Sequence, residues 1–230
     1  MASFTPPAAS AGQCKGVPFG KAINTAVENK AVFDAFDQTP AGKSDPSKCK
    51  ALLAFPDDAA IFWSSKLAID ADGPAAGPGR PSGSRLDPGS GQDDTSLHFS
   101  NGRGFPSETI PYIVLPGGSF RAKTGLSLGD VATVIFRDKI TAAICGDMGP
   151  TRKIGEGSIR LHEALHPPAP DPCIRDGNGF CRRIHNVSID EDVLFFVFPG
   201  SAFDELNAAT LEGMVKERAL SLFNKLRGVT

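Results

Sequence analysis

Short apolar runs, separated by turns rich in glycine and proline, constrain the fold of this chain more than any other feature of its sequence. The 25 glycines and 19 prolines among 230 residues favour many short strands and turns over long helices. The runs that suit strands are 59–63, 67–70, 95–99, 110–116, 130–136, 140–145 and 192–199. "SSK" (64–66) is predicted to be a turn between the first two of these runs. The sequence therefore predicts a mainly β protein.

The clearest hairpin joins residues 130–136 to residues 140–145 through the turn "RDK". Both runs are almost continuously apolar, which indicates strands that are buried on both faces, as in a small barrel. Helical spacing of apolar residues is present in 21–37 and, more strongly, in 203–226, whose apolar stripe should pack on the core. We expect both helices to pack outside the barrel.

The chain shows no internal repeat and no clean linker, so we expect one domain over residues 1–230, with residues 1–20 flexible. Residues 71–93 are rich in glycine, proline and serine. They are predicted to form a loop insertion, and such loops are often functional lids.

The charge balance and the lengths of the apolar runs exclude two classes of partner, nucleic acids and membranes. The net charge is -2, so the sequence indicates no basic surface for a nucleic acid. No apolar run approaches the roughly 18 residues that a membrane span requires. We therefore expect a monomer that binds neither nucleic acid nor membrane, and that attracts a charged substrate only within a lined cleft.

Five cysteines bear on the redox compartment. Cys173 and Cys181 flank the turn-rich "IRDGNGF" and could form one disulfide, Cys14 and Cys49 flank the first predicted helix and could form another, and Cys145 is left over. Five free thiols are the alternative. The cysteines favour a secreted chain, although "MASFTPPAASAGQ" has no signal-peptide pattern. We expect an extracellular protein, with a cytoplasmic one as the alternative.

Two carboxylates are prominent in "CGDMGPTRKIGEGSIRL" (145–161). Asp147 ends an apolar strand, which would place it at the rim of the barrel on a rigid element. Glu156 lies between two glycines in a predicted turn, where a sugar chain could approach the backbone closely, and "SIRL" resumes an extended pattern. Facing carboxylates suit glycoside hydrolysis, by inversion at about 6.5–9.5 Å and by retention at about 5–5.5 Å. In the alternative, Asp147 caps a turn and Glu156 pairs with Lys153 or Arg160.

Asp70 and Asp72, in "AIDADG", form a second acidic group after a predicted strand. They could line the cleft as an anionic patch for a cationic substrate, or they could close a turn. The stretch lacks the ligand spacing of a calcium loop. The sequence also lacks zinc spacing, a phosphate-binding loop and a nucleophile elbow, so we expect no metal site and no cofactor.

The stretch "GDVATVIFRDKITAAICGDMGPTRKIGEGSIRLHEAL", with "IPYIVLPGG" and "AIFWSSKLAIDADG" upstream, resembles the fungal-type chitosanases of glycoside hydrolase family 75. The resemblance extends from about Ala59 to about Pro199. It implies an endo-acting enzyme that hydrolyses β-1,4-linked glucosamine polymers with inversion. It matches the family's catalytic Asp and Glu to Asp147 and Glu156. The same stretch is similar to the catalytic loop of double-psi β-barrel glycan enzymes, which implies a small six-stranded double-psi-like barrel.

On this interpretation Asp147, at the end of a buried strand, is the acid, and Glu156, in an open turn, is the ionised base. The two acids in "AIDADG" would bind ammonium groups of the substrate, and Tyr112 could instead be a core residue, as could Trp63. The predicted substrate-binding residues are Asp70, Asp72, Tyr112 and Arg160. Two alternatives stay open. One is a cleaver of peptidoglycan or another amino-sugar polymer, including lytic cleavage by a single acid. The other is a non-catalytic carbohydrate-binding module.

Overall fold

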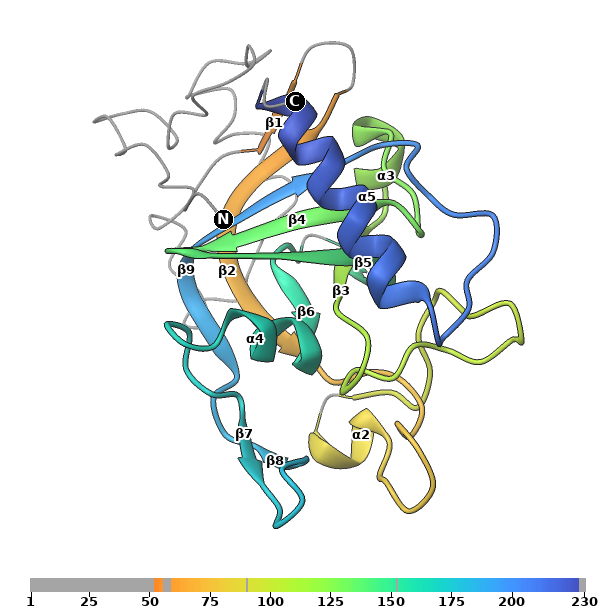
Figure 1. Ribbon diagram of the computed structural model, residues 1–230, viewed down its shortest axis with the longest axis vertical. Coiled ribbons are helices and arrows are strands. Elements are labelled where there is room, and N and C mark those ends of the chain that lie inside the picture. The colour runs from red at the N-terminus through yellow and green to blue at the C-terminus, as the bar shows by residue number, and fades with distance from the viewer. Residues whose placement is uncertain (1–51, 56–58, 90, 152, 228–230) are drawn as a thin grey trace.

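Six strands close into a barrel (Figure 1). The structure is a computed structural model that describes residues 52–55, 59–89, 91–151 and 153–227. The strand order is β2–β6–β3–β5–β4–β9, and β9 pairs back with β2, so the ring of strands is closed. The six strands are β2 (Ile61–Asp70), β3 (Tyr112–Gly117), β4 (Val131–Phe136), β5 (Lys139–Thr151), β6 (Glu156–Ser158) and β9 (Ser188–Val197). The prediction of a small six-stranded barrel in a mainly β protein is confirmed.

The ring contains two parallel pairings, β2 with β6 and β3 with β5, and the other pairings are antiparallel. A further short strand, β1 (Leu52–Ala54), pairs with the start of β2. The β4–β5 hairpin that "RDK" predicts is present. The strand predicted at 140–145 is longer than expected, because β5 continues through Asp147 to Thr151.

The predicted turn at 64–66 is wrong, because the two runs that it was to separate belong to the single strand β2. Ser64 and Ser65 are only 3% exposed, and both pair with β9. A register shift between Ser65 and Leu67 accommodates the polar stretch within the strand. A local irregularity in the ladder therefore replaces the expected turn.

The predicted strand at 95–99 is also wrong, since this segment contributes only an isolated bridge. Its polar groups bond to a distant part of the chain instead of to a ladder. The Ser96 amide and hydroxyl both donate to the carboxylate of Asp147, 51 residues later. No local pattern of residues could indicate such a contact.

Apolar side chains from five of the ring strands fill the barrel interior. Trp63 on β2 is 1% exposed and stacks on Phe195 of β9, with 5.2 Å between the ring centroids. Two short helices, α3 (Phe120–Thr124) and α4 (Ile159–Leu165), add apolar side chains to the same cluster. Trp63 is thus a core residue, which was the alternative that the sequence left open.

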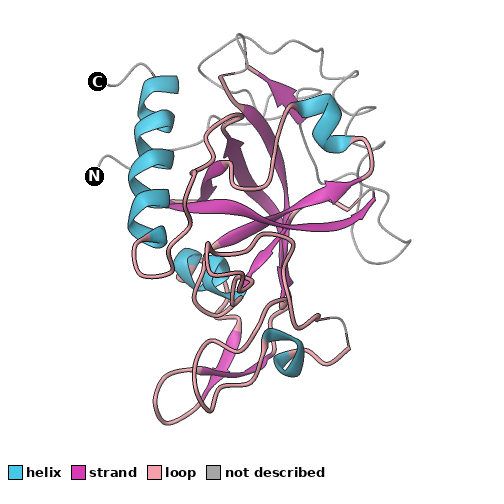
Figure 2. Cartoon of the chain, turned by 90° about the vertical axis from the view of Figure 1, so that its right-hand side faces the viewer, coloured by secondary structure: helices cyan, strands magenta, loops and turns pink. Residues whose placement is uncertain are grey.

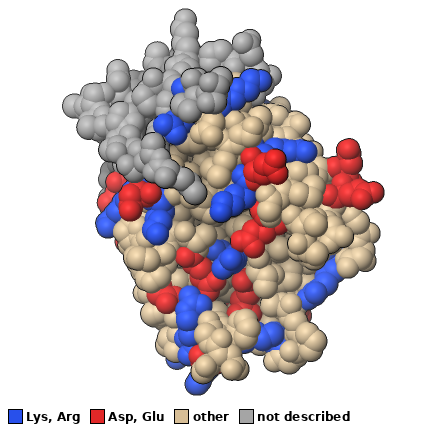
Figure 3. Space-filling view, in the orientation of Figure 1, with Lys and Arg blue, Asp and Glu red and all other residues tan. Residues whose placement is uncertain are grey.

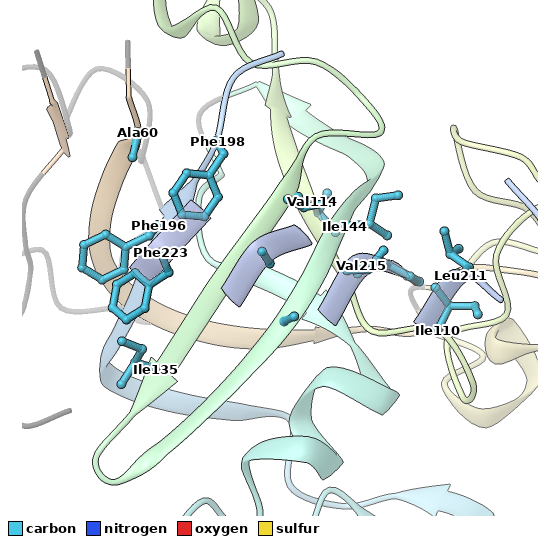
Figure 4. Close-up of a cluster of buried hydrophobic side chains, with 14 of the residues drawn as sticks. Ala60, Ile110, Val114, Ile135, Ile144, Phe196, Phe198, Leu211, Val215 and Phe223 are labelled. Atoms are coloured by element: carbon cyan, nitrogen blue, oxygen red, sulfur yellow. The ribbon is translucent and has the colours of Figure 1, made fainter. Parts of the chain in front are cut away.

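The C-terminal helix α5 (Leu211–Leu226) packs across the outside of the barrel, over β4 and β5 (Figures 1 and 2). Phe223 on its buried face is 1% exposed and meets Phe196 of β9, with 4.9 Å between the ring centroids (Figure 4). The predicted packing of a C-terminal helix outside the barrel is confirmed. The N-terminal helix predicted at 21–37 lies outside the described residues. Within the described ranges, no helix combines the length and the apolar character needed to span a bilayer.

One end of the molecule is formed by a hairpin and a helical turn (Figures 1 and 2). The strands β7 (Cys173–Arg175) and β8 (Cys181–Ile184) pair with each other, and β8 contacts α2 (Gly83–Leu86). Because α2 lies within 71–93, the segment predicted as a loop insertion contains a short helix and packs on this hairpin.

A disulfide joins Cys173 to Cys181, as predicted. It holds together the two strands of the β7–β8 hairpin. Cys145 is free and buried in the barrel interior. The other predicted pair, Cys14 with Cys49, lies outside the described residues.

Truncating Phe223 should weaken the attachment of α5 to the barrel. Phe223→Ala removes a buried ring from its contact with Phe196, so the free energy of unfolding should fall by about 3–5 kcal/mol. Urea denaturation followed by circular dichroism measures the change. Met214→Ala, on the same helix but 36% exposed, is the control and should change the value by less than about 1 kcal/mol. Equal losses in both variants would contradict this packing.

Candidate functional site

Asp147 lies within β5, and a bulge decides which way its side chain points. Ile113 of β3 pairs with Cys145, and the next residue, Val114, pairs with Asp147. Gly146 is therefore an extra residue in β5. Cys145 faces the barrel interior, and because side chains alternate along a strand, a regular β5 would turn Asp147 inward too. The bulge instead turns Asp147 outward, on the same face as Val114.

Gly146 is the residue that this bulge requires. A Cβ at this position would lie 2.6 Å from Cβ of Tyr112 and 3.1 Å from Cδ2 of Phe105. Both side chains are fully buried, so neither can move away easily. The glycine in "CGD" thus lets the bulge lie directly against the Tyr112 ring.

Three donors hold the carboxylate of Asp147, which is 4% exposed. Its Oδ1 accepts hydrogen bonds from the Ser96 amide at 2.8 Å, from the Ser96 hydroxyl and from the Met148 amide at 2.7 Å. All three bonds fall on one oxygen, which leaves Oδ2 as the atom for proton transfer. Sequence reasoning missed Ser96, because its contact with Asp147 is formed only by the fold.

Glu156 lies on β6 and is 7% exposed, so the prediction that it sits in an open turn is wrong. Its carboxylate forms an ion pair with Nζ of Lys153, the pairing that the alternative interpretation expected. The ammonium group stabilises the negative charge of the carboxylate. The side chain reaches toward β5, where a Cβ on Gly149 would be 3.2 Å from Oε2 of Glu156.

The glycines on either side of Glu156 face protein rather than a cleft. Gly155 has a φ of +80°, and a Cβ there would meet the Lys66 carbonyl. A Cβ on Gly157 would lie 2.8 Å from Cδ2 of Leu161. Leu161 belongs to α4, which begins directly after β6, so "SIRL" is not an extended run. The expectation that these glycines let a sugar approach the backbone is wrong, because they let β6 pack on β2 and α4.

One strand, β3, lies between the two carboxylates. Val114 pairs with Asp147 on one side, and Ile113 pairs with Gly157 on the other. Glu156 therefore lies in the same row across the sheet as Val114 and Asp147, and all three side chains point to one face. Two interstrand spacings put the backbones of the two acidic residues about 9.5 Å apart. The fold brings Asp147 and Glu156 to one surface of the barrel.

Asp70 and Asp72, at the end of β2, join Asp147 in what we call the aspartate cluster. One carboxylate oxygen of each residue lies within 4.8 Å of the other two. Oδ1 of Asp70 accepts the Asp72 amide at 3.1 Å, and Oδ1 of Asp72 accepts the Gln92 amide. Burial, and then the charges of Asp72 and Asp147, raise the pKa of Asp70 well above its usual value. Burial also raises the pKa of Asp72, to about 6, although the Gln92 amide opposes this.

The hydrogen-bond donors around the aspartate cluster oppose the binding of a metal ion. Calcium takes about six to eight oxygen ligands, and magnesium demands near-ideal octahedral geometry. In the part of the chain that the structure describes, the cluster oxygens meet the N–H and O–H donors of Asp72, Gln92, Ser96 and Met148. A cation would have to compete with these donors, so we assign no cation to the cluster.

The other two predicted binding residues, Tyr112 and Arg160, lie in different environments. Tyr112 is 0% exposed, and its hydroxyl donates to the carbonyl of Asp72 at 2.9 Å. Tyr112 therefore supports the aspartate cluster from behind and presents no surface to a substrate. Arg160, on α4, is partly exposed, and its guanidinium donates to Oε1 of Glu212 at 3.1 Å.

A pocket of about 540 Å³ is lined in part by Arg160, but neither the aspartate cluster nor Glu156 lines it. Ser107 lies between the pocket and the cluster, since its hydroxyl donates to the Asp70 carbonyl at 2.6 Å and its carbonyl accepts the Arg160 amide at 2.9 Å. The ring of Phe180, 52% exposed, lies beneath the Arg80 guanidinium at its edge. The ion pairs that line the pocket are Arg80–Glu108, Arg160–Glu212 and Arg175–Glu163. Acidic and basic side chains are likewise interspersed on the face shown in Figure 3.

Two carboxylates that point to one face of a closed barrel are the arrangement that glycoside hydrolysis requires. The profile of a family described as fungal chitosanase of glycosyl hydrolase group 75 matches residues 67–224, more than half of the chain. The chain belongs to this family, as the resemblance implied. A search of curated proteins found no significant match. The matched range includes the aspartate cluster, Glu156 and Arg160.

Adding a methyl group at the bulge should destabilise the fold at the site. Gly146→Ala forces a Cβ against two buried rings, so the free energy of unfolding should fall by about 1–3 kcal/mol. Urea denaturation measures the change. Gly177→Ala is the control, because a Cβ there meets nothing within 4 Å. A Gly146→Ala protein as stable as the wild type would show that β5 does not need the glycine.

Proposed function

We propose that the protein is an endo-chitosanase that hydrolyses β-1,4 linkages between glucosamine units of chitosan with inversion of configuration. The observation that supports this most is that Asp147 and Glu156 lie on one barrel face, with one strand between them, in a chain of the chitosanase family. The strand β3 between them separates their backbones by about 9.5 Å, and the proposal places their carboxylates at the separation of about 6.5–9.5 Å that inverting enzymes use. The proposed enzyme is a monomer, and its reaction uses no cofactor.

In the proposed mechanism Asp147 is the general acid and Glu156 the general base. Asp147 gives its proton to the glycosidic oxygen as the bond from that oxygen to the anomeric carbon breaks. A water attacks the anomeric carbon from the opposite face, and Glu156 takes a proton from it. One water is consumed and two shorter chains leave, the new reducing end having inverted configuration. Glu156 then releases its proton to solvent, and Asp147 regains one.

The environments of the two carboxylates support these roles. Asp147 lies beside Asp70 and Asp72, and like charges at close range favour a proton within the group. Glu156 instead forms an ion pair with the ammonium group of Lys153. The opposite surroundings of the two residues are the pattern by which one fold keeps an acid and a base at the same pH.

The substrate's charge fits the acidic surface. Protonated glucosamine units are ammonium cations, and the protein has a nearly balanced net charge of -2, so attraction must come from the site itself. Asp72, 8% exposed, is the member of the aspartate cluster that we propose to meet an ammonium group. The pocket lined by Arg160 would hold a further sugar unit, with Arg160 donating to its hydroxyl groups.

An extracellular location is also part of the proposal. The disulfide between Cys173 and Cys181 is the observation that supports it, because disulfides persist in oxidising compartments. A polymer such as chitosan is a substrate that an enzyme meets outside the cell.

Removing either carboxylate should abolish most of the activity. Asp147→Asn and Glu156→Gln keep the size of the side chains but cannot transfer the proton, so kcat should fall by about 100-fold or more. Release of reducing ends from highly deacetylated chitosan measures it, with circular dichroism to show that both variants fold. Asp190→Asn, an exposed acid on β9, is the matched control and should retain wild-type activity. Wild type without activity on chitosan would refute the proposed function.

Alanine variants of the same two residues separate the two roles. Azide should restore activity to Glu156→Ala, because it attacks without a base, and it should not restore activity to Asp147→Ala. A Glu156→Ala protein that retains most of its activity without azide would point to the single-acid alternative. Proton NMR of the first products should show the α configuration, and β products would exclude inversion.

Arg160 should affect substrate binding more than chemistry. Arg160→Ala should raise KM several-fold with little change in kcat, because the residue lines this pocket and does not contact the carboxylate pair. Its ion pairs are partly exposed and contribute roughly 0–1 kcal/mol, so the fold should persist. Arg182→Ala, which removes an exposed arginine of β8, is the control. An unchanged KM in Arg160→Ala would remove this residue from the proposed binding set.

A further inference from the structure

One oxygen of the aspartate cluster is without a partner. Among the described residues no donor reaches Oδ2 of Asp70, and this oxygen is buried from water. A buried, ionised carboxylate oxygen with neither a donor nor water is strongly unfavourable. A proton on Oδ2 removes the difficulty, because the oxygen then becomes a donor and a neighbouring carboxylate can accept from it.

Suitable acceptors face Asp70 from two directions. Asp72 follows it in the chain, Asp147 faces it from β5, and an oxygen of each lies within the 4.8 Å cluster. After burial and the charges of Asp72 and Asp147, the charge of Glu156 on β6 also raises the pKa of Asp70. Tyr112 on β3 stays neutral, because burial raises its pKa far above the usual value. Lys153 pairs with Glu156 rather than with the cluster. The described surroundings of Asp70 therefore offer it like charges rather than a cation.

The hydrogen bonds of Asp147 make this proton useful. Its Oδ1 accepts from all three donors that hold Asp147, which leaves Oδ2 for a proton. A general acid must be protonated when the substrate binds. A neighbour that holds a proton close to Asp147 meets this requirement.

We propose that Asp70 is a positioning residue that keeps one proton shared among the three carboxylates of the aspartate cluster, so that Asp147 can deliver it to the leaving glycosidic oxygen. This rests on the proposed role of Asp147 as the acid. When Asp147 gives up the proton, the bond from the glycosidic oxygen to the anomeric carbon breaks and the cluster is left with no proton. The mutual repulsion of three carboxylates then draws a proton back from solvent before the next turnover.

The pH dependence of activity tests this inference. Asp70→Asn keeps the Oδ1 that accepts the Asp72 amide but removes one negative charge, so the cluster should lose its proton at a lower pH. Activity that requires a protonated acid falls as pH rises. The alkaline limb of kcat in Asp70→Asn should therefore move to lower pH by about one unit or more, with about a tenfold loss at neutral pH. Asp72→Asn should move it in the same direction, and Asp190→Asn should leave it in place.

Other outcomes would overturn the inference. A raised KM at every pH with an unshifted alkaline limb would make Asp70 a ligand for substrate ammonium groups. A uniform loss of kcat with an unshifted limb would make it a structural residue. Loss of activity in EDTA, with recovery on adding calcium or magnesium, would show that the cluster holds a cation rather than a proton.

Stability provides a readout that needs no substrate. The pKa of Asp72 is about 6 in the folded protein against an ordinary value of 3.8, so the folded state binds more protons between these values. Its contribution to stability therefore falls as pH rises through this range. His162, whose pKa burial lowers to about 4, acts in the opposite direction, so each variant is compared with the wild type and not judged alone.

The free energy of unfolding of the wild type, relative to that of Asp70→Asn, should fall steadily as pH rises from about 4 to about 6. Asp190→Asn should show no such change. A constant difference for Asp70→Asn would overturn the shared proton. If the wild type does not cleave chitosan but this difference does depend on pH, the proposed function fails while the shared proton stands.

Discussion

The hydrogen bonding of β6 to two strands at once is the constraint on which the rest of the structure depends. These three residues pair in parallel with the end of β2 and antiparallel with β3, and so join strands that are far apart in the sequence. The Ser158 hydroxyl accepts from the Tyr112 amide and from the Leu161 amide, so one side chain both fixes β3 and begins α4. The same strand places Glu156 in the row of Asp147. The pairing of β6 thus both completes the ring of strands and places Glu156 at the site.

Local irregularities, rather than regular strand geometry, create the chemistry of the site. The extra residue at Gly146 turns Asp147 away from an apolar interior where a charge would be costly. The loop that holds Ser96 then supplies donors that no ladder provides. The segment after β2 brings Asp72 next to Asp70, under the Tyr112 hydroxyl. Each acid is therefore held by a different part of the chain, and all are supported by one rigid barrel.

The parts of the structure that depend on neighbouring residues could be predicted from the sequence. The β4–β5 hairpin follows from two apolar runs and a short polar turn, and the stripe of α5 follows from its period. The pairing of Cys173 with Cys181 spans a short loop and was also predictable. The continuity of β2 through Ser64 and Ser65 was not, because its ladder partner β9 lies at the other end of the chain. Ser96 and the double pairing of β6 were unpredictable for the same reason.

The strand between Asp147 and Glu156 has a consequence for stereochemistry. Residues in one row on adjacent strands are about 4.8 Å apart at the backbone, and residues with one strand between them, as Asp147 and Glu156 have β3, are about 9.5 Å apart. Retention and inversion need carboxylates separated by about 5–5.5 Å and about 6.5–9.5 Å. On the proposed mechanism, the strand order of the barrel, and not its loops, sets the distance between the two backbones. Loops around the site can then diverge in sequence to suit other sugars without changing that distance.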